Sequence, residues 1–199
     1  HTEKTLYNGQ VPDPDTELTS RTYSFALEDE WKIDKFVLTL GGSYDIFDKY
    51  KRYQPDSRFS TNGIVHTEAG KDKQEPCYLA GLAYDLNSDT NIYLSKSRKV
   101  RFPTMRNLYS DGTSGPLGDP DLDSEVTDNS ETGIHWIIFQ GLKIDAAGFF
   151  SLVSNLINFD NQTGRFEQYG KATMAGMEIS LTSEFEKFIY ARLSYNYLR

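Results

Sequence analysis

Apolar and polar residues alternate with a period of two along most of this 199-residue chain. In the segment 22–28, Tyr23, Phe25 and Leu27 fall on one side, and the residues between them are polar or small. Successive side chains of a β-strand point to opposite faces of the sheet, so this alternation is typical of strands with one apolar face. No segment has a helical period of useful length. The chain is therefore predicted to be all-β.

The same alternation recurs in seven further segments, which predicts about eight strands in all: 35–45, 77–85, 91–98, 132–138, 143–153, 175–181 and 189–197. Short links are expected after Glu28, Leu86, Phe139 and Thr182, and long links over 47–74, 100–128 and 159–168. Antiparallel membrane barrels alternate short turns on one side of the membrane with long loops on the other. The links therefore predict an antiparallel up-and-down meander that forms part of a transmembrane β-barrel, with a hairpin at each short link.

One face of the predicted strands is apolar enough to contact lipid. The residues expected there are Leu38, Leu40, Leu82, Ile134, Phe150, Ile179 and Leu193. Aromatic residues near predicted strand ends match the aromatic girdles of membrane barrels. They are Tyr44, Tyr84, Trp136, Tyr195 and Tyr197. The alternative is that these rings are cross-strand packing partners in a soluble sheet.

Composition excludes some classes of protein. The net charge of −8 argues against a nucleic-acid partner, which requires basic patches. No run of about 18 apolar residues exists, so no transmembrane helix is predicted. The mean hydropathy of −0.57 remains compatible with a membrane barrel, whose strands need an apolar residue only at every second position.

A series of short motifs follows the predicted strands in a fixed order. Gly41–Asp45 ends one strand, Arg-Phe-Pro-Thr at 101–104 leads to Leu-Tyr at 108–109, and Asp-Pro-Asp-Leu-Asp-Ser-Glu occupies 119–125. In order and spacing these segments resemble the barrel domain of TonB-dependent outer-membrane receptors. Ser43, Asp119 and Ser124 depart from the Arg, Asn and Pro usual in that family. The matched motif positions are Arg101, Pro103, Leu108, Tyr109, Pro120, Leu122, Glu125, Glu131, Gly133, Asn155, Gly176 and Glu178.

The resemblance implies a role in transport. It implies a location in the bacterial outer membrane, contact with outer-membrane lipid, and uptake of a scarce small-molecule ligand such as a ferric siderophore or similar metal chelate. It also implies energy from the TonB complex, received through a plug domain. Nothing in the sequence resembles the plug, and the family's barrel has more strands than this chain supplies. Residues 1–199 are therefore expected to be a partial β-barrel domain, cut at both ends.

The first long loop carries basic and aromatic residues that could recognise an anionic ferric chelate. Tyr50, Arg52, Tyr53 and Arg58 are the ligand-binding candidates, because guanidinium groups and rings bind anions through charged hydrogen bonds and stacking. The alternative is that these residues form a solvated outer surface and contact no ligand.

Catalytic and metal chemistry have little support in the sequence. The histidines His1, His66 and His135 form no metal-binding spacing with each other or with Cys77. No Ser nucleophile sits in a Gly-x-Ser-x-Gly motif, so we expect neither an enzyme nor a resident cofactor. The acidic residues at 119–125 alternate as calcium ligands do, but Ser124 stands where an EF-hand needs Gly, which favours a solvated loop.

A soluble, lipocalin-like β-barrel that binds a ligand in its mouth is the alternative function. Such a barrel would have an apolar inner face. Here the second face of the strands is polar, with Lys143, Asp145, Glu178, Arg192 and Asn196. A polar inner face favours the water-filled lumen of a membrane barrel.

Overall fold

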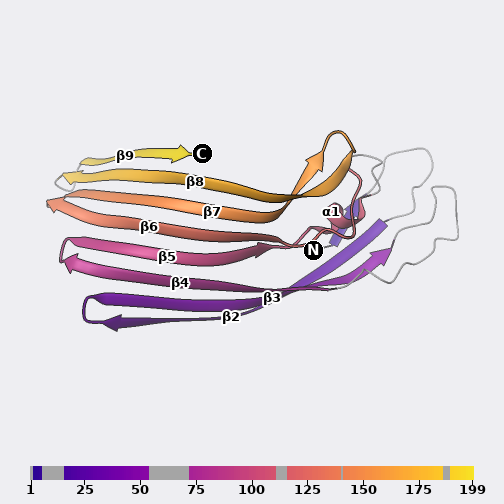
Figure 1. Ribbon diagram of the computed structural model, residues 1–199, viewed down its shortest axis with the longest axis horizontal. Helices are drawn as coiled ribbons and strands as arrows, with labels where there is room; N and C mark the ends of the chain where they lie inside the picture. The colour runs from indigo at the N-terminus through magenta and orange to yellow at the C-terminus, as the bar shows by residue number, and fades with distance from the viewer. Residues whose placement is uncertain (1, 6–15, 54–71, 111–115, 140, 186–188) are drawn as a thin grey trace.

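The computed structural model describes residues 2–5, 16–53, 72–110, 116–139, 141–185 and 189–199. They form one nine-stranded sheet and one short helix (Figure 1). The elements are β1 (Thr2–Thr5), β2 (Thr16–Ile33), β3 (Phe36–Tyr53), β4 (Lys73–Asn87), β5 (Thr90–Arg101), α1 (Met105–Tyr109), β6 (Glu125–Phe139), β7 (Leu142–Asp160), β8 (Arg165–Phe185) and β9 (Ile189–Leu198).

The strands lie side by side in sequence order, and every pair of neighbouring strands is antiparallel. The predicted all-β meander is therefore confirmed. The eight predicted strands are β2 to β9, and the four-residue β1 was not predicted. The only parallel contact in the described part of the chain is a single bridge between Leu117 and Arg165, which lies outside the sheet ladder.

One predicted link was wrong. The segment 159–168 is not a long loop, because Phe159 pairs with Phe166 and Asp160 with Arg165, leaving a turn at 161–164. The Asp160 carboxylate accepts the Gln162 N–H at 2.7 Å, and Gly164 adopts a φ of 69°. An Asp-initiated turn that ends on a left-handed Gly closes the hairpin tightly. The strands therefore run further than their apolar alternation indicated.

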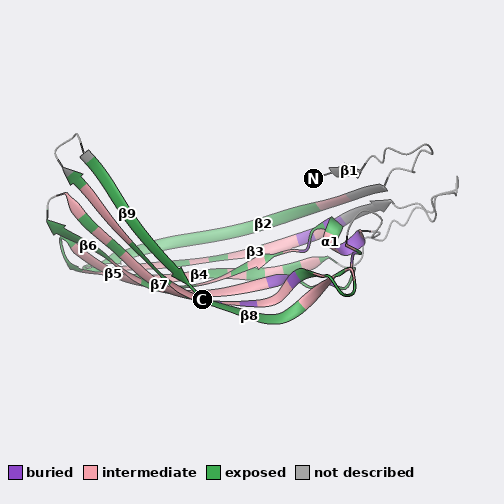
Figure 2. Cartoon of the chain, turned by 90° about the horizontal axis from the view of Figure 1, so that it is seen from above, coloured by how far each residue is buried: buried purple, intermediate pink, exposed green. Residues whose placement is uncertain are grey.

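The sheet is curved rather than flat. Figure 2 shows it bent into a trough, with β2 and β9 rising on the same side. The sheet stays open, since no pairing joins β1 to β9 among the described residues. A hollow of about 1180 Å³ occupies the concave side, and the residues that line it include Ser95, Asn129, Glu131, Glu178 and Asn196.

The convex face is apolar. Strand register places the seven residues that were predicted to face lipid on this face, although Ile179 also borders the hollow. Many of its large side chains are exposed, with Leu94 at 58% and Leu193 at 71%. An apolar surface of this extent needs a partner such as lipid. Among the described residues, no helix is both long and apolar enough to span a membrane.

The β2–β3 and β4–β5 turns lie at one end of the sheet, and α1 lies at the other end with the short β7–β8 turn (Figure 1). Buried side chains are concentrated at the α1 end, which is called the loop end below. The cluster of buried apolar residues there consists of Phe47, Met105, Leu108, Tyr109, Leu122 and Ile157. The loop end is therefore the most tightly packed part of the described structure.

Candidate functional site

The β5–β6 connection folds back onto the sheet at the loop end. It contains α1, which begins with a reciprocal cap: the Thr104 hydroxyl accepts the Asn107 N–H at 3.2 Å, and the Asn107 side chain accepts the Thr104 N–H at 2.9 Å. Such a cap satisfies N–H groups that the first turn of a helix leaves without partners. Pro103, before the cap, is fully buried. The motif at 101–104 therefore starts this helix.

The apolar residues of the connection pack against three strands. Leu108 is 1% exposed and Leu122 is 2% exposed. Phe102 stacks on Phe47 of β3 with ring centroids 5.3 Å apart, while Ile157 of β7 and Phe166 of β8 complete the contact. Burying side chains of this size stabilises the packed connection by roughly 1.5–3 kcal/mol each. The connection is thereby held against strands distant from it in sequence.

The return half of the connection passes very close to α1. A Cβ at Gly118 would lie 2.6–2.7 Å from backbone atoms of residues 108–110, which no ordinary side chain tolerates. Gly118 N donates to the Ser110 carbonyl at 2.8 Å, and Leu117 N donates to the Gly164 carbonyl at 2.9 Å. The connection is therefore bonded both to itself and to the β7–β8 turn.

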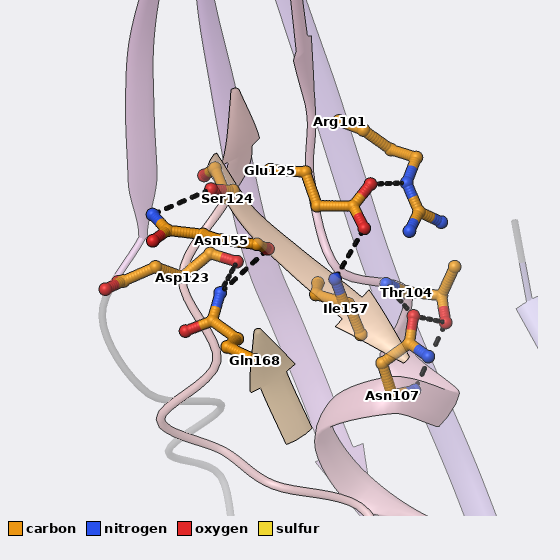
Figure 3. A network of polar contacts seen from close by, with 9 residues as sticks. All are labelled: Arg101, Thr104, Asn107, Asp123, Ser124, Glu125, Asn155, Ile157 and Gln168. Atoms are coloured by element: carbon orange, nitrogen blue, oxygen red, sulfur yellow. Dashed lines mark hydrogen bonds and ion pairs between the residues drawn. The ribbon is translucent and has the colours of Figure 1, made fainter. Parts of the chain in front are cut away.

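Glu125, at the start of β6, links the connection to β5 and β7 (Figure 3). It is 6% exposed, and its carboxylate accepts from the Arg101 guanidinium and from the Ile157 N–H, the latter at 2.6 Å. Burial pushes the pKa of Glu125 upward, but the hydrogen bonds from Arg101 and Ile157 outweigh it and hold the pKa below its ordinary value. Glu125 is thus charged at neutral pH and bridges three segments.

Asn155 supplies a second link in the same network. It has a φ of 56°, a conformation that Asn adopts more readily than most residues, and its amide donates to the Ser124 carbonyl at 3.4 Å. Gln168 of β8 donates to the Asp123 carbonyl at 2.9 Å, and Lys73 forms an ion pair with Asp123 at 3.2 Å. Seven motif residues therefore meet here: Arg101, Pro103, Leu108, Tyr109, Leu122, Glu125 and Asn155. Pro120 is exposed on the turn beside them.

The remaining motif residues lie on the concave face of the sheet, called the concave wall below, away from this network. They are Glu131, Gly133, Gly176 and Glu178. The Tyr93 hydroxyl donates to Glu131 at 2.8 Å, and its ring lies against Gly133. His135 stacks on the same ring with centroids 5.2 Å apart and lies 2.6 Å from the Asp145 carboxylate. Tyr93 was not identified from sequence, because nothing in its own strand pattern distinguishes it.

A second aromatic ring covers a motif glycine further along the wall. A Cβ at Gly176 would lie 2.6 Å from the Phe149 ring and 2.3 Å from the Tyr197 carbonyl. Glu178 follows on the same face, opposite Asn196. Arg192 donates to the Ser180 hydroxyl at 3.0 Å. The concave wall is thus polar and charged, as the sequence predicted.

The four predicted ligand-binding residues are placed only in part. Tyr50, Arg52 and Tyr53 belong to the last residues of β3, at the loop end, where Arg52 pairs with Leu18 and Tyr53 with Glu17 of β2. Arg58 lies outside the described residues. Their role in ligand binding remains a prediction.

Two lysines lie near these residues, Lys49 and Lys73. Lys49 of β3 is 7% exposed, and Lys73 of β4 pairs with Phe47, two residues before Lys49. Burial, and then the charge of Lys73, lower the pKa of Lys49, against the opposing pull of Asp72 and Asp121. Asp72 and Asp121, together with the ion pair between Lys73 and Asp123, already place carboxylates beside these two lysines.

The described residues contain no group of three or more His, Cys, Asp or Glu side chains that could hold a metal ion. Within the acidic segment at 119–125, the Asp119 carboxylate accepts the Asp121 N–H at 2.9 Å. The Glu125 carboxylate accepts hydrogen bonds from Arg101 and from the Ile157 N–H. These carboxylates therefore hold the backbone of the connection in place.

The family pattern described as "TonB dependent receptor-like, beta-barrel" matches residues 2–199. The chain belongs to this family. Its members are proteins of the bacterial outer membrane, and the receptor barrel described here has that location.

Individual relatives agree with this assignment. The barrel is 29% identical over 105 residues to the catecholate siderophore receptor Fiu of Escherichia coli K12, covering 51% of this chain and 14% of Fiu. Among solved structures it resembles the copper transporter OprC with a TM-score of 0.72, at 19% identity, covering 94% of this chain and 29% of OprC. It also resembles the FrpB iron transporter of Neisseria meningitidis with a TM-score of 0.67, at 15% identity, covering 94% of this chain and 26% of FrpB. The chain thus spans less than a third of each of these proteins.

Proposed function

We propose that this chain is part of the barrel of a receptor that takes up an anionic metal chelate, such as a ferric siderophore, across the outer membrane. The observation that carries the proposal is the family match over residues 2–199, supported by the similarity to a catecholate siderophore receptor. The role is binding and transport rather than catalysis.

The loop end fits the recognition of an anion. The last residues of β3 lie there and carry Tyr50, Arg52 and Tyr53. Ferric chelates with several ionised oxygens present negative charge and flat rings, which ammonium, guanidinium and aromatic groups bind. The site at this end is therefore proposed to receive the chelate.

Residues 1–199 are proposed to be a partial barrel domain within a longer receptor. The lining of the concave hollow includes the polar side chains Glu131, Glu178 and Asn196, which suit contact with a folded polar domain inside a closed barrel. That domain would be the family's plug, through which the TonB complex would act. The polar wall also argues against the lipocalin-like alternative, since a soluble barrel needs an apolar interior to fold.

The test uses the full-length receptor in cells that lack their other iron receptors. Growth under iron limitation and binding of a radiolabelled ferric tris-catecholate are measured for the receptor and for the Arg52→Gln/Arg58→Gln double variant. We expect weaker binding by roughly tenfold, the effect of losing about 1.4 kcal/mol. The control is Lys32→Gln/Lys143→Gln, which removes two cations at the turn end. If both variants bind the chelate equally well, Arg52 and Arg58 do not contact it and belong to the solvated surface. If the unaltered receptor takes up no chelate, the proposed function is wrong.

A further inference from the structure

The β5–β6 connection lies on the concave side of the sheet. Ser43 of β3 lines the hollow, and Phe47, which the connection covers, is on the same face because strand side chains alternate. Lys99 of β5 also lines the hollow, and Arg101, where the connection begins, follows it by two residues. The connection therefore folds into the trough. Its described residues, 102–110 and 116–124, are called the mouth strap below.

The mouth strap reaches across the trough from β3 to β8. On one side, Leu108 of α1 belongs to the same buried cluster as Phe47 of β3. On the other side, Leu117 N donates to the Gly164 carbonyl, and the Leu117 carbonyl accepts the Phe166 N–H, both at 2.9 Å. Neighbouring strands are about 4.8 Å apart, so the five intervals from β3 to β8 span about 24 Å along the sheet.

Several independent contacts anchor the strap. Leu108 and Leu122 are almost fully buried beneath it. Asp123 forms an ion pair with Lys73 of β4 at 3.2 Å, and its carbonyl accepts from Gln168 of β8 at 2.9 Å (Figure 3). Lifting the strap would expose both leucines to water and break these bonds together. Segments that open easily have few buried apolar contacts, and the strap is of the opposite kind.

The strap lies at the entrance to the hollow. The two long links of the chain, β3–β4 and β5–β6, both leave the sheet at the loop end (Figure 1). Membrane barrels of this type carry their long links on the outside. The loop end is therefore the outer mouth, and a ligand that moves from outside into the hollow must pass the strap.

We propose that the mouth strap stays in place during uptake and limits the size of the chelate that can enter the barrel. The strap narrows the opening on the β3–β8 side, and its anchors hold it there when the ligand arrives. Thr104 and Arg106 are exposed on α1, so a polar surface borders the opening. This inference rests on the proposed function, because it concerns the route of the same ligand.

The first experiment locks the strap to the sheet. Leu117 and Arg165 are bridge partners, so the double variant Leu117→Cys/Arg165→Cys can form a disulfide. All proteins are full-length receptors that also carry Cys77→Ser, and the control is Leu117→Cys alone under the same oxidant. Uptake of radiolabelled ferric tris-catecholate by cells is measured before and after oxidation, and gel migration confirms folding.

We expect the locked receptor to take up the chelate at the rate of the control. Uptake that is lost on oxidation and restored by a reductant would overturn the proposal, since the strap would then have to open. Failure of the two cysteines to cross-link in the folded receptor would also overturn it, because the strap would not be held against the β7–β8 turn. Absence of uptake in the control and in the unaltered receptor would instead refute the proposed function.

The second experiment tests the size limit. The probes are ferric tris-catecholate and the same chelate coupled without a spacer to a cyclic peptide. Leu108→Asn places a polar group in the buried cluster and should release α1, whereas Arg106→Asn makes the same residue on the exposed side of that helix. The measured quantity is the ratio of the two dissociation constants, which cancels a general change in affinity.

We expect the conjugate to bind about tenfold more weakly than the small chelate in the unaltered receptor and in Arg106→Asn, and almost equally in Leu108→Asn. The same ratio in all three proteins would overturn the size limit. If a variant fails to fold, hydrogen–deuterium exchange of the unaltered receptor decides the matter. Amides of the strap should keep their protection when the chelate binds, and a loss of protection would contradict a fixed strap.

Discussion

The ring of Tyr93 lies flat against Gly133 on the neighbouring strand. A Cβ on Gly133 would sit 2.6 Å from three atoms of that ring, including the hydroxyl oxygen that bonds Glu131. The glycine and the tyrosine therefore depend on each other: the glycine leaves the space that the ring fills.

Replacing Gly133 with Ala should displace Tyr93 and break its bond to Glu131. We expect a loss of about 1–3 kcal/mol in the free energy of unfolding, as found for overpacked sites. Urea-dependent unfolding of the receptor from lipid vesicles measures it. The control is Gly81→Ala on the same concave face, where the nearest side-chain atom would be 3.7 Å away. Equal stability of the two variants would contradict the tight contact.

Replacing Glu125 with Ala should release the β5–β6 connection from the sheet. The change removes the acceptor of both Arg101 and the buried Ile157 N–H, which should cost about 3 kcal/mol. Glu125→Gln keeps an acceptor for Ile157 and should cost less. Limited proteolysis within residues 102–124 reports the release. Cleavage at the same rate in all three proteins would show that the apolar contacts alone hold the connection.

Acid should loosen the same connection. The folded-state pKa of Glu125 lies below its unfolded value, which is near 4.5. Its stabilising contribution is therefore complete above pH 4.5 and is lost as the pH falls through the folded-state pKa. Protease susceptibility of the connection measured between pH 6 and pH 3 should rise toward the acid end. In Glu125→Gln this part of the pH dependence should disappear, and its persistence would assign the effect to another carboxylate.

Two buried serines should respond oppositely to replacement with Ala. Ser124 is 2% exposed, and its hydroxyl has no partner among the described residues, so Ser124→Ala should raise stability by about 1 kcal/mol. Ser151 is 8% exposed and donates to Asn129 at 2.6 Å, so Ser151→Ala should lower stability by about 1 kcal/mol. Unfolding in urea distinguishes the signs. Destabilisation by both changes would mean that the Ser124 hydroxyl has a partner, such as a bound water.

A charged substitution should impair membrane assembly on the convex face but not on the concave face. Leu40→Arg places a cation on the apolar side and should impair membrane assembly by roughly 2–4 kcal/mol. Thr39→Arg, one residue away, places the same cation on the polar side and should assemble normally. Folding into vesicles, followed by gel migration, compares them. Similar assembly of both variants would reverse the assignment of faces.

The strand order and the faces could be predicted because they depend on local pattern. Alternation at Tyr23, Phe25 and Leu27 identifies a strand and its apolar side without knowledge of its neighbours. The strand ends could not be predicted in the same way. Phe159 and Phe166 pair beyond the expected end of β7 because a tight turn at 161–164 brings them together.

The motif residues were recognised from sequence, but their physical roles were not. Arg101, Glu125 and Asn155 are scattered over more than fifty positions, and no local pattern indicates that they share one network. Their meeting depends on register across β5, β6 and β7 and on the path of the connection around α1. The partners Ile157 and Gln168 were missed because one acts through its backbone N–H and the other is an ordinary polar residue in its own strand.

The sequence by itself determined the all-β class, the meander order, the apolar face and the family, because each of these depends on periodicity or on the identity of residues in order. Only the tertiary structure decided which residues from different strands touch. Contacts such as Tyr93 with Gly133 and Glu125 with Ile157 depend on strand register and sheet curvature. Register aligns each position of one strand with a position on the neighbouring strand that is far away in sequence. The local residue pattern of a single strand does not determine that alignment.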